Sequence, residues 1–320
     1  MSKKGLFIMV SVLLMVVLLM ASIAGAEAEA DRDSSEVRLL KEESLDSKRP
    51  ELSEEFVASQ DITPEYFETL SITPSLLASF DLGTWFYGGV EPIGAVLPST
   101  MHAHAWVDVT GDGNNNIVAS FDNGTWYLDD DGFWRVITRS SAKSLLGAPD
   151  GWLYASFASG TWLYDAWEEE WFTYSTSTAH ALTWAYMIDD GYFDLVASFD
   201  GGTWYVDQGE NIWVQLTHST ARALEGYYSW FEDKPYLHAS FSSGTWVYDI
   251  VENDWYNYTS WTAHAMTMAN MYEGDFDPVL VASFDDGTWY LVWEDHGEGW
   301  WSWEWAKLSP GTARVLQGLF

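Results

Sequence analysis

Six cationic or ionisable side chains recur at regular intervals in a chain that is otherwise strongly acidic. Each lies in a phrase close to Ser/Thr-Ala-His/Lys/Arg-Ala, and His alternates with Lys or Arg along the chain. Such side chains bind carboxylate, sulfate or phosphate groups, so a ring of them predicts an anion site. The alternative is that each one pairs with a carboxylate or carbonyl of a neighbouring repeat. The six residues are His104, Lys143, His180, Arg222, His264 and Arg314.

The spacing of these residues is set by a Trp that lies nine positions earlier in five of the six copies. The pairs are Trp134 with Lys143, Trp171 with His180, Trp213 with Arg222, Trp255 with His264 and Trp305 with Arg314. His104 departs from this rule, because Ala95 stands nine residues before it.

A second candidate site is a loop with oxygen side chains at alternate positions and a Gly at the turn, the spacing that a calcium loop requires. Its candidate ligands are Asp108, Thr110, Asp112, Asn114 and Asn116. The loop precedes an apolar stretch and resembles the calcium loop of FG-GAP and VCBS-type propeller repeats. That resemblance implies a propeller and a bound Ca²⁺. A turn rich in Asn, Gly and Asp that needs no ion is the alternative.

A third candidate site is a group of Trp residues in the one long insertion, between Trp289 and Trp305. Indole rings stack on the apolar faces of sugars while nearby polar groups bind hydroxyls. Packing of the insertion against the rest of the domain is the alternative. The four Trp residues are Trp293, Trp300, Trp301 and Trp303.

The sequence contains no recognisable catalytic motif. There is no Cys, no Ser-His-Asp order, no phosphate-binding loop and no complete zinc motif. Pairs of Asp and Glu are too common here to nominate a general acid and base. We therefore name no catalytic residue.

A phrase that occurs six times, Ala-Ser-Phe-x-x-Gly-Thr-Trp, supplies the elements that must position these side chains. Its copies recur about every 40 residues, a period typical of β-propeller blades. The Gly predicts a left-handed turn between two strands, and the Trp is expected in the core of each blade. The copies start at Ala78, Ala119, Ala155, Ala197, Ala239 and Ala282.

One copy illustrates the four short strands expected in each blade. They are residues 179–184, 194–199, 203–206 and 213–217. The chain ends on a first strand, after Arg314, and residues 76–80 form a second strand with no first strand before them. The C-terminal strand should therefore complete the first blade, which closes a ring of six antiparallel, four-stranded blades.

The Tyr that follows each Gly-Thr-Trp shifts by one position from blade to blade, which moves it to the opposite face of the strand. Because the cations alternate in step, we expect pseudo-threefold symmetry with a unit of two blades. Tyr127, Tyr205 and Tyr290 follow the Trp directly, and Tyr87, Tyr164 and Tyr248 come one residue later.

The N-terminal part differs from the repeats. Residues 1–26 resemble a secretory signal, with an uncleaved membrane anchor at residues 6–26 as the alternative. Residues 27–70 are polar and read as an acidic flexible linker, and the propeller covers residues 71–320. We expect a secreted or extracytoplasmic protein with a monomeric propeller, attached to a membrane only if the signal stays uncleaved.

The net charge of −34 makes nucleic acid a poor partner, since its recognition needs clustered Lys and Arg. The plan of short blades rich in Trp is similar to that of six-bladed propeller lectins. We therefore expect a non-catalytic binding protein for a glycan or an extracellular protein ligand. The alternatives are an enzyme, a lyase or hydrolase, that acts on acidic polysaccharide at the cationic channel, and a structural or adhesive surface protein.

Overall fold

The structure is a computed structural model, and it describes residues 76–81, 83–88, 91–97, 99–148, 151–188, 192–207, 212–229, 232–271, 278–295 and 301–318. The signal predicted at residues 1–26 and the linker predicted at residues 27–70 lie outside these described residues. Within them, no helix is long and apolar enough to cross a membrane.

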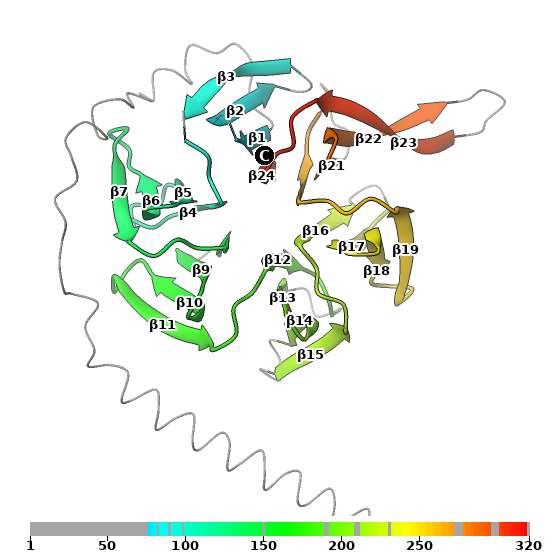
Figure 1. Cartoon of the computed structure of the whole chain (residues 1–320). Coiled ribbons are helices and arrows are strands. Elements are labelled where there is room, and N and C mark those ends of the chain that lie inside the picture. Colours follow the sequence, from blue (N-terminus) through cyan, green and yellow to red (C-terminus); the bar gives the residue numbers. More distant parts are fainter. Residues whose placement is uncertain are drawn as a thin grey trace, which may run out of the picture. The chain divides into compact units, whose positions relative to one another are not determined.

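Six four-stranded antiparallel sheets are arranged as blades around a central axis (Figure 1), which confirms the predicted six-bladed β-propeller. In each blade the first strand is innermost and the fourth is outermost. Blade one contains β24 (Val315–Gly318), β1 (Leu76–Phe80), β2 (Gly83–Gly88) and β3 (Glu91–Leu97). Blade two contains β4 (Ala103–Val107), β5 (Asn116–Phe121), β6 (Gly124–Leu128) and β7 (Trp134–Thr138). Blade three contains β8 (Ser144–Gly147), β9 (Trp152–Phe157), β10 (Gly160–Asp165) and β11 (Glu170–Ser175).

The second half of the ring follows the same order. Blade four contains β12 (Ala181–Ala185), β13 (Asp194–Phe199), β14 (Gly202–Asp207) and β15 (Ile212–Thr217). Blade five contains β16 (Ala223–Ser229), β17 (Lys234–Phe241), β18 (Gly244–Asp249) and β19 (Asp254–Thr259). Blade six contains β20 (Ala265–Ala269), β21 (Val279–Phe284), β22 (Gly287–Asp295) and β23 (Trp301–Ser309).

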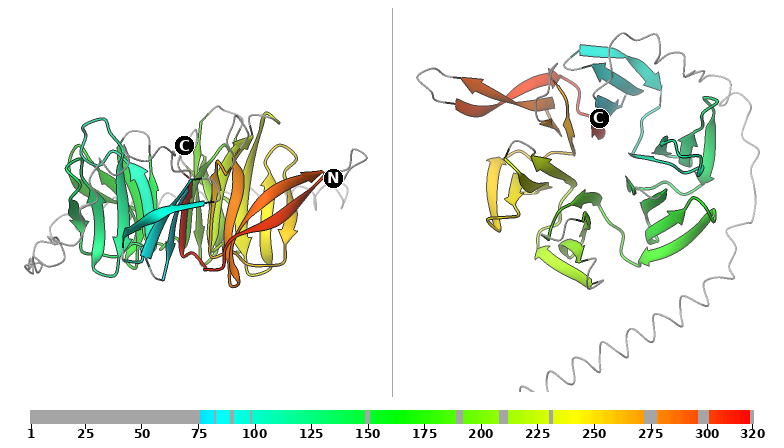
Figure 2. Two further views of the ribbon diagram at one scale, coloured as in Figure 1. Left: turned by 90° about the horizontal axis from the view of Figure 1, so that it is seen from above. Right: turned by 180° about the vertical axis from the view of Figure 1, so that it is seen from behind.

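The ring is closed by the C-terminal strand, as the sequence predicts. β24 pairs antiparallel with β1, with Ala78 opposite Leu316 and Leu76 opposite Gly318. Figure 2 shows this last strand, in red, inside the N-terminal blade, in cyan. First and last strands thus share one sheet, so β1 has a partner on its inner side as the second strand of every other blade does.

The repeated phrase joins each blade to the next one through hydrogen bonds. In blade four, the Ser198 Oγ accepts from the backbone N–H of Ala221 at 2.6 Å, in the segment that leads into blade five. The Thr203 hydroxyl donates to the Ser219 carbonyl at 2.9 Å, and the Thr220 hydroxyl donates back to the Phe199 carbonyl at 2.8 Å. The equivalent bonds recur around the ring, so we call this arrangement the latch.

The residue types of the phrase follow from this role. Its Ala has 0% exposed surface in all six copies, and its Ser and Thr are buried as well. Its Gly has a positive φ in every copy, for example 129° at Gly202, where a Cβ would collide with the Thr217 carbonyl oxygen. The expectation that the Trp forms the core is correct only for Trp126, since the other five are half-buried.

The six blades associate as three pairs, in agreement with the predicted two-blade unit. Tyr127 and Tyr164 pack in the cluster between blades two and three, and Tyr205 and Tyr248 pack in the cluster between blades four and five. Tyr87 and Tyr290 meet in the same way between blades six and one. The shift of the Tyr by one position therefore brings two Tyr residues to every second interface.

The innermost strands are paired in the same manner. Gly147 and Gly226, on β8 and β16, lie so close to the carbonyls of Trp106 and Trp184 on the preceding first strand that a Cβ would collide. In addition, the Gly226 N–H donates to the Thr183 Oγ1 at 3.0 Å. The Gly318 N–H donates to the Thr267 Oγ1 at 2.9 Å in the same way, so three pairs of first strands line the channel: β4 with β8, β12 with β16 and β20 with β24.

Candidate functional site

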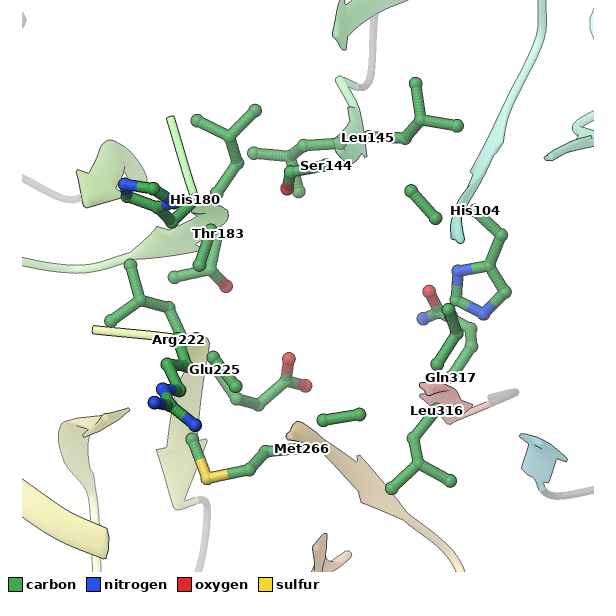
Figure 3. A pocket seen from close by; sticks show the side chains of 18 of the residues that line it. His104, Ser144, Leu145, His180, Thr183, Arg222, Glu225, Met266, Leu316 and Gln317 are labelled. Atoms are coloured by element: carbon green, nitrogen blue, oxygen red, sulfur yellow. The ribbon is translucent and has the colours of Figure 1, made fainter. Parts of the chain in front are cut away.

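A cavity of about 350 Å³ lies on the axis, lined by the first strands of the blades (Figure 3). Six cationic or ionisable side chains line it, each directly before a first strand. Their backbone N–H groups donate to the Ser carbonyl of the repeated phrase in the same blade, at 2.7–2.8 Å, which fixes them in one register. We call these residues the mouth cations: His102, Lys143, His180, Arg222, His264 and Arg314.

His102, not His104, occupies this position in blade two. The His102 N–H donates to the Ser120 carbonyl at 2.8 Å, as the N–H of His180 does to Ser198. The prediction of His104 for this position was wrong by two residues. In the other blades the position was counted from a fourth-strand Trp, and blade one has no such Trp. His104 instead lies further along β4, where it is 8% exposed and lines the cavity.

Four of the mouth cations are paired with an Asp of the turn between the second and third strands of their own blade. His102, His180 and His264 each bring Nε2 to 2.7 Å from an Asp Oδ1, and Arg314 brings Nε to 2.6 Å from Asp81. The Asp partners of the three His are Asp122, Asp200 and Asp285. These four side chains are therefore paired with a carboxylate, but it belongs to their own blade, whereas the alternative to an anion site predicted one from a neighbouring repeat.

The other two mouth cations, Lys143 and Arg222, have no carboxylate at this place. The turn residues that correspond to Asp200 are Ala158 in blade three and Ser242 in blade five. Within the described part of the chain, Lys143 and Arg222 form no salt bridge and are exposed. They flank blade four, so this sector of the mouth carries two uncompensated positive charges.

Further along the first strands, the residue two positions after each cation is apolar in five blades and His104 in blade two. Burial lowers the pKa of His104 to about 4, so its ring is neutral at physiological pH. Its Nε2 has no hydrogen-bond partner among the described residues. The five apolar residues are Leu145, Leu182, Leu224, Met266 and Leu316.

One position further, blade five contributes the only carboxylate among the described residues that line the cavity, Glu225. Its Oε1 accepts from the Met268 N–H at 3.1 Å and from the Thr267 hydroxyl at 3.4 Å. Its Oε2 has no partner in the described structure. Burial raises the pKa of Glu225 to about 7, and the hydrogen bonds from Met268 and Thr267 only partly offset that rise.

Aromatic side chains line the cavity at the ends of the first strands. Trp184 and Phe193 belong to its lining, and Tyr186 packs on Phe193 with ring centroids 3.8 Å apart and ring planes tilted by 33°. Tyr228 of blade five meets Tyr186 edge to face at 5.5 Å. The cavity thus has cations at one end, aromatic rings at the other and Glu225 between them.

The predicted calcium loop is a closed turn in this structure. Asp108 accepts backbone N–H groups with both carboxylate oxygens, from Gly111 at 2.7 Å and from Gly113 at 2.8 Å. Asn116 is buried, and its Oδ1 accepts from the Val109 N–H. Asp194 bonds Met187 in the same way in blade four, so this position has a structural role.

The remaining candidate ligands of the loop, Thr110, Asp112 and Asn114, are exposed. Within the described residues there is no group of three or more His, Cys, Asp or Glu that could hold a metal ion. A calcium ion at this loop stays a prediction.

The Trp-rich insertion extends the hairpin of β22 and β23, which projects from the ring (Figure 1). Trp293 and Trp303 are cross-strand partners, and Trp301 is opposite Asp295. Trp300 lies outside the described residues. A sugar-binding role for these residues also stays a prediction.

Sequence reasoning missed Glu225, although a signal for it exists. Once the cations are aligned in register, the positions three residues after them contain Ala, Leu, Thr, Glu, Thr and Gln. Glu225 is the only ionisable side chain in that series. Comparison of aligned blades, rather than a search for motifs, would have identified it.

Comparisons with known proteins give only distant likenesses in fold. No family model matches the sequence, and neither does any curated protein. Among solved structures, the chain is similar to an extracellular domain from B. thetaiotaomicron, at 11% identity and a TM-score of 0.47 over 74% of this chain and 34% of that one. The chain therefore spans about a third of the length of that protein.

Two further likenesses have similar strength. One is to a chain of a nidogen/laminin complex, at 8% identity and a TM-score of 0.49 over 78% of this chain and 99% of that one. The other is to the dihydro-heme d1 dehydrogenase NirN, at 12% identity and a TM-score of 0.46 over 84% and 82%.

Proposed function

We propose that this protein is a non-catalytic, extracytoplasmic binding protein for an acidic carbohydrate or a comparable anionic polymer, which it holds at the mouth of the propeller channel. The observation that carries the proposal is the pair of unpaired mouth cations, Lys143 and Arg222, on either side of blade four. In a chain with a net charge of −34, two positive charges without carboxylate partners at one cavity favour an anionic ligand.

The chemistry of the mouth suits carboxylate or sulfate groups. Arg222 presents a planar guanidinium that binds such groups with two parallel hydrogen bonds, and Lys143 adds a flexible point charge. His180, between them, is already held by Asp200. A polymer that carries many such groups binds with higher overall affinity, because once one group is bound the others are held near the second cation.

A screen of acidic and neutral glycans, with and without calcium, tests this function. We expect binding of acidic members that falls at least tenfold in the double variant Lys143→Ala/Arg222→Ala, which corresponds to about 1.4 kcal/mol. Arg135→Ala is the matched control, since Arg135 pairs with Asp129 away from the cavity lining. Equal loss in both variants, or no binding of any acidic glycan, would refute the proposal.

An enzyme that acts on acidic polysaccharide is the second candidate, and Glu225 favours it. A carboxyl group with a pKa near 7 is suited to proton transfer at neutral pH. Hydrolysis of a glycosidic bond commonly needs two carboxyl groups, however, and Glu225 has no second carboxylate beside it among the described lining residues. Release of shortened products in the same screen would favour the enzyme, and silence would favour a structural role.

A further inference from the structure

The channel contains two hydrogen-bond acceptors with no partner among the described residues. One is the Oε2 of Glu225, whose Oε1 is fixed by Met268 and Thr267. The other is the Oε1 of Gln317, whose amide nitrogen donates to the Gly318 carbonyl at 3.0 Å. In Figure 3 the two side chains point into the cavity from β16 and β24, with Met266 of blade six between them.

Neither oxygen is fully buried, so water can reach both, and a ligand that supplies hydrogen-bond donors can replace that water. The fold does not require these acceptors, because Ala105 and Leu146 occupy the corresponding positions in blades two and three. The long polar side chains of Glu225 and Gln317 therefore differ from the Ala, Leu and Thr residues at this depth in the other four blades. They match a ligand that carries several hydroxyl groups.

The three kinds of side chain lie in sequence along the cavity. Glu225 follows Arg222 by three residues on the first strand, which places the two levels about 10 Å apart along the axis. Phe193 and Trp184 line the cavity as well, and aromatic rings pack on the apolar face of a sugar. A cavity of about 350 Å³ is at the small end of ligand sites and suits the end of a chain rather than its full width.

We propose that the channel receives the end of an acidic glycan chain, with a carboxylate or sulfate held at Lys143 and Arg222 and the hydroxyl groups of a further sugar ring bound by Glu225 and Gln317. This inference rests on the proposed function, because it assigns the depth at which the same ligand is bound. It makes Glu225 a residue that determines specificity for a chain end.

The test is calorimetric titration of the full protein with trisaccharides that carry one carboxylate or sulfate, uronate and sulfated galactose oligomers, and with the neutral galactose trimer. We expect binding of at least one acidic trimer and none of the neutral one. Glu225→Leu should weaken that binding about tenfold, the effect of one lost charge-assisted hydrogen bond. Lys143→Ala/Arg222→Ala should weaken it at least as much.

Two controls separate folding from binding. Leu146 shows that a Leu side chain fits the equivalent position in blade three, but Glu225→Leu also removes the acceptor of the Met268 N–H and should lower the unfolding temperature. Glu225→Gln keeps an amide oxygen for that N–H, should unfold near the wild-type temperature, and should still bind the acidic trimer more weakly, because its NH₂ group cannot accept from a hydroxyl group. Glu168→Gln alters an exposed turn away from the cavity lining and should bind as the wild type does.

The outcomes distinguish this inference from the function on which it rests. If acidic polymers bind in a manner that depends on Lys143 and Arg222, but no acidic trimer binds or Glu225→Leu binds unchanged, the chain-end site is wrong and the mouth site stands. If neither polymers nor trimers bind, both are wrong.

Discussion

The latch and the channel are built from the same blades, but the residues of the latch repeat in every blade and those of the channel do not. The latch repeats around the ring. A buried Ser bonds to the backbone of the next blade in all six copies, accepting from an N–H in five and donating to the Ala179 carbonyl in blade three, and a buried Thr does so in all six. The channel strands differ from blade to blade at the level of Glu225 and at His104. Repetition therefore marks what closes the ring, and departures from it mark where a ligand site is best sought. Substitutions in the latch should therefore affect stability, and substitutions in the channel should affect binding.

The turn Gly of the latch is expected to be the position least tolerant of change. Gly202→Ala places a Cβ against the Thr217 carbonyl at a φ of 129°, and we expect a loss of roughly 3 kcal/mol in the free energy of unfolding. Gly201→Ala, in the same turn, has no atom within 4 Å of the added Cβ and should change stability by about 0.5 kcal/mol or less. Urea denaturation measures both, and equal losses would contradict this explanation.

The latch hydrogen bond is expected to come next. Ser198→Ala leaves the buried N–H of Ala221 without its acceptor, which should cost about 2 kcal/mol. Ser243→Ala, in an exposed turn, is the matched control. A loss at Ser198 no larger than that at Ser243 would show that the latch does not hold the blades together.

A buried histidine predicts a loss of stability in acid. His238 lies between Tyr227 and Tyr258, neither ring nitrogen has a partner among the described residues, and burial lowers its pKa to about 4. The unfolded chain therefore binds more protons than the folded one below pH 6.5, and stability falls as the pH drops towards 4, by up to about 3 kcal/mol.

Replacement by Val, the residue at the corresponding positions Val196 and Val281, should remove the contribution of His238, while His104, whose pKa is also about 4, keeps its own. Thermal unfolding at pH 7 and pH 4.5 compares His238→Val with the exposed control His218→Val. Glu225 changes stability with pH in the opposite direction. Its raised pKa gives a contribution to the free energy of unfolding that is present below pH 4.5 and is lost as the pH rises through 7. An unchanged pH dependence in His238→Val would show that this histidine is not the acid-sensitive group.

Much of the fold was predictable because it follows from repetition. Six equal phrases indicate six blades, the glycines indicate the turns, and a first strand at the C-terminus indicates the closure. The Tyr shift could be read as a two-blade unit since a displacement of one residue reverses the face of a strand. The latch was not predicted, because a buried Ser or Thr in a repeat does not reveal which backbone group it bonds.

The site was less predictable than the fold. The convergence of the cations on one cavity follows from their register, but the register failed at His104, where the guiding Trp is absent and His102 takes the place. Which cations are paired depends on turn residues far from them in the sequence: Asp200 follows His180 by 20 positions, and Asp81 lies 233 positions before Arg314. A correlation at that distance is visible only after the strands are aligned.

Asp81→Asn should have the smallest effect on stability, and it tests the difference between paired and unpaired mouth cations. Asp81→Asn removes the partner of Arg314, an exposed pair whose loss should cost less than about 1 kcal/mol. The substitution also leaves Arg314 of blade one without a carboxylate partner, as Lys143 is in blade three and Arg222 in blade five. Affinity for an acidic ligand should rise severalfold, and the gain should shrink with added salt, because exposed charges are screened.

The matched control is Asp254→Asn, which makes the same charge change at an exposed residue outside the cavity lining. If both variants gain equally, the net charge of the protein governs binding rather than the mouth. If neither gains, the missing carboxylate is not what makes Lys143 and Arg222 a site. The position of these two cations around Glu225 and Phe193 would then have to define it, because the freed Arg314 has the same chemistry in a different sector of the same channel.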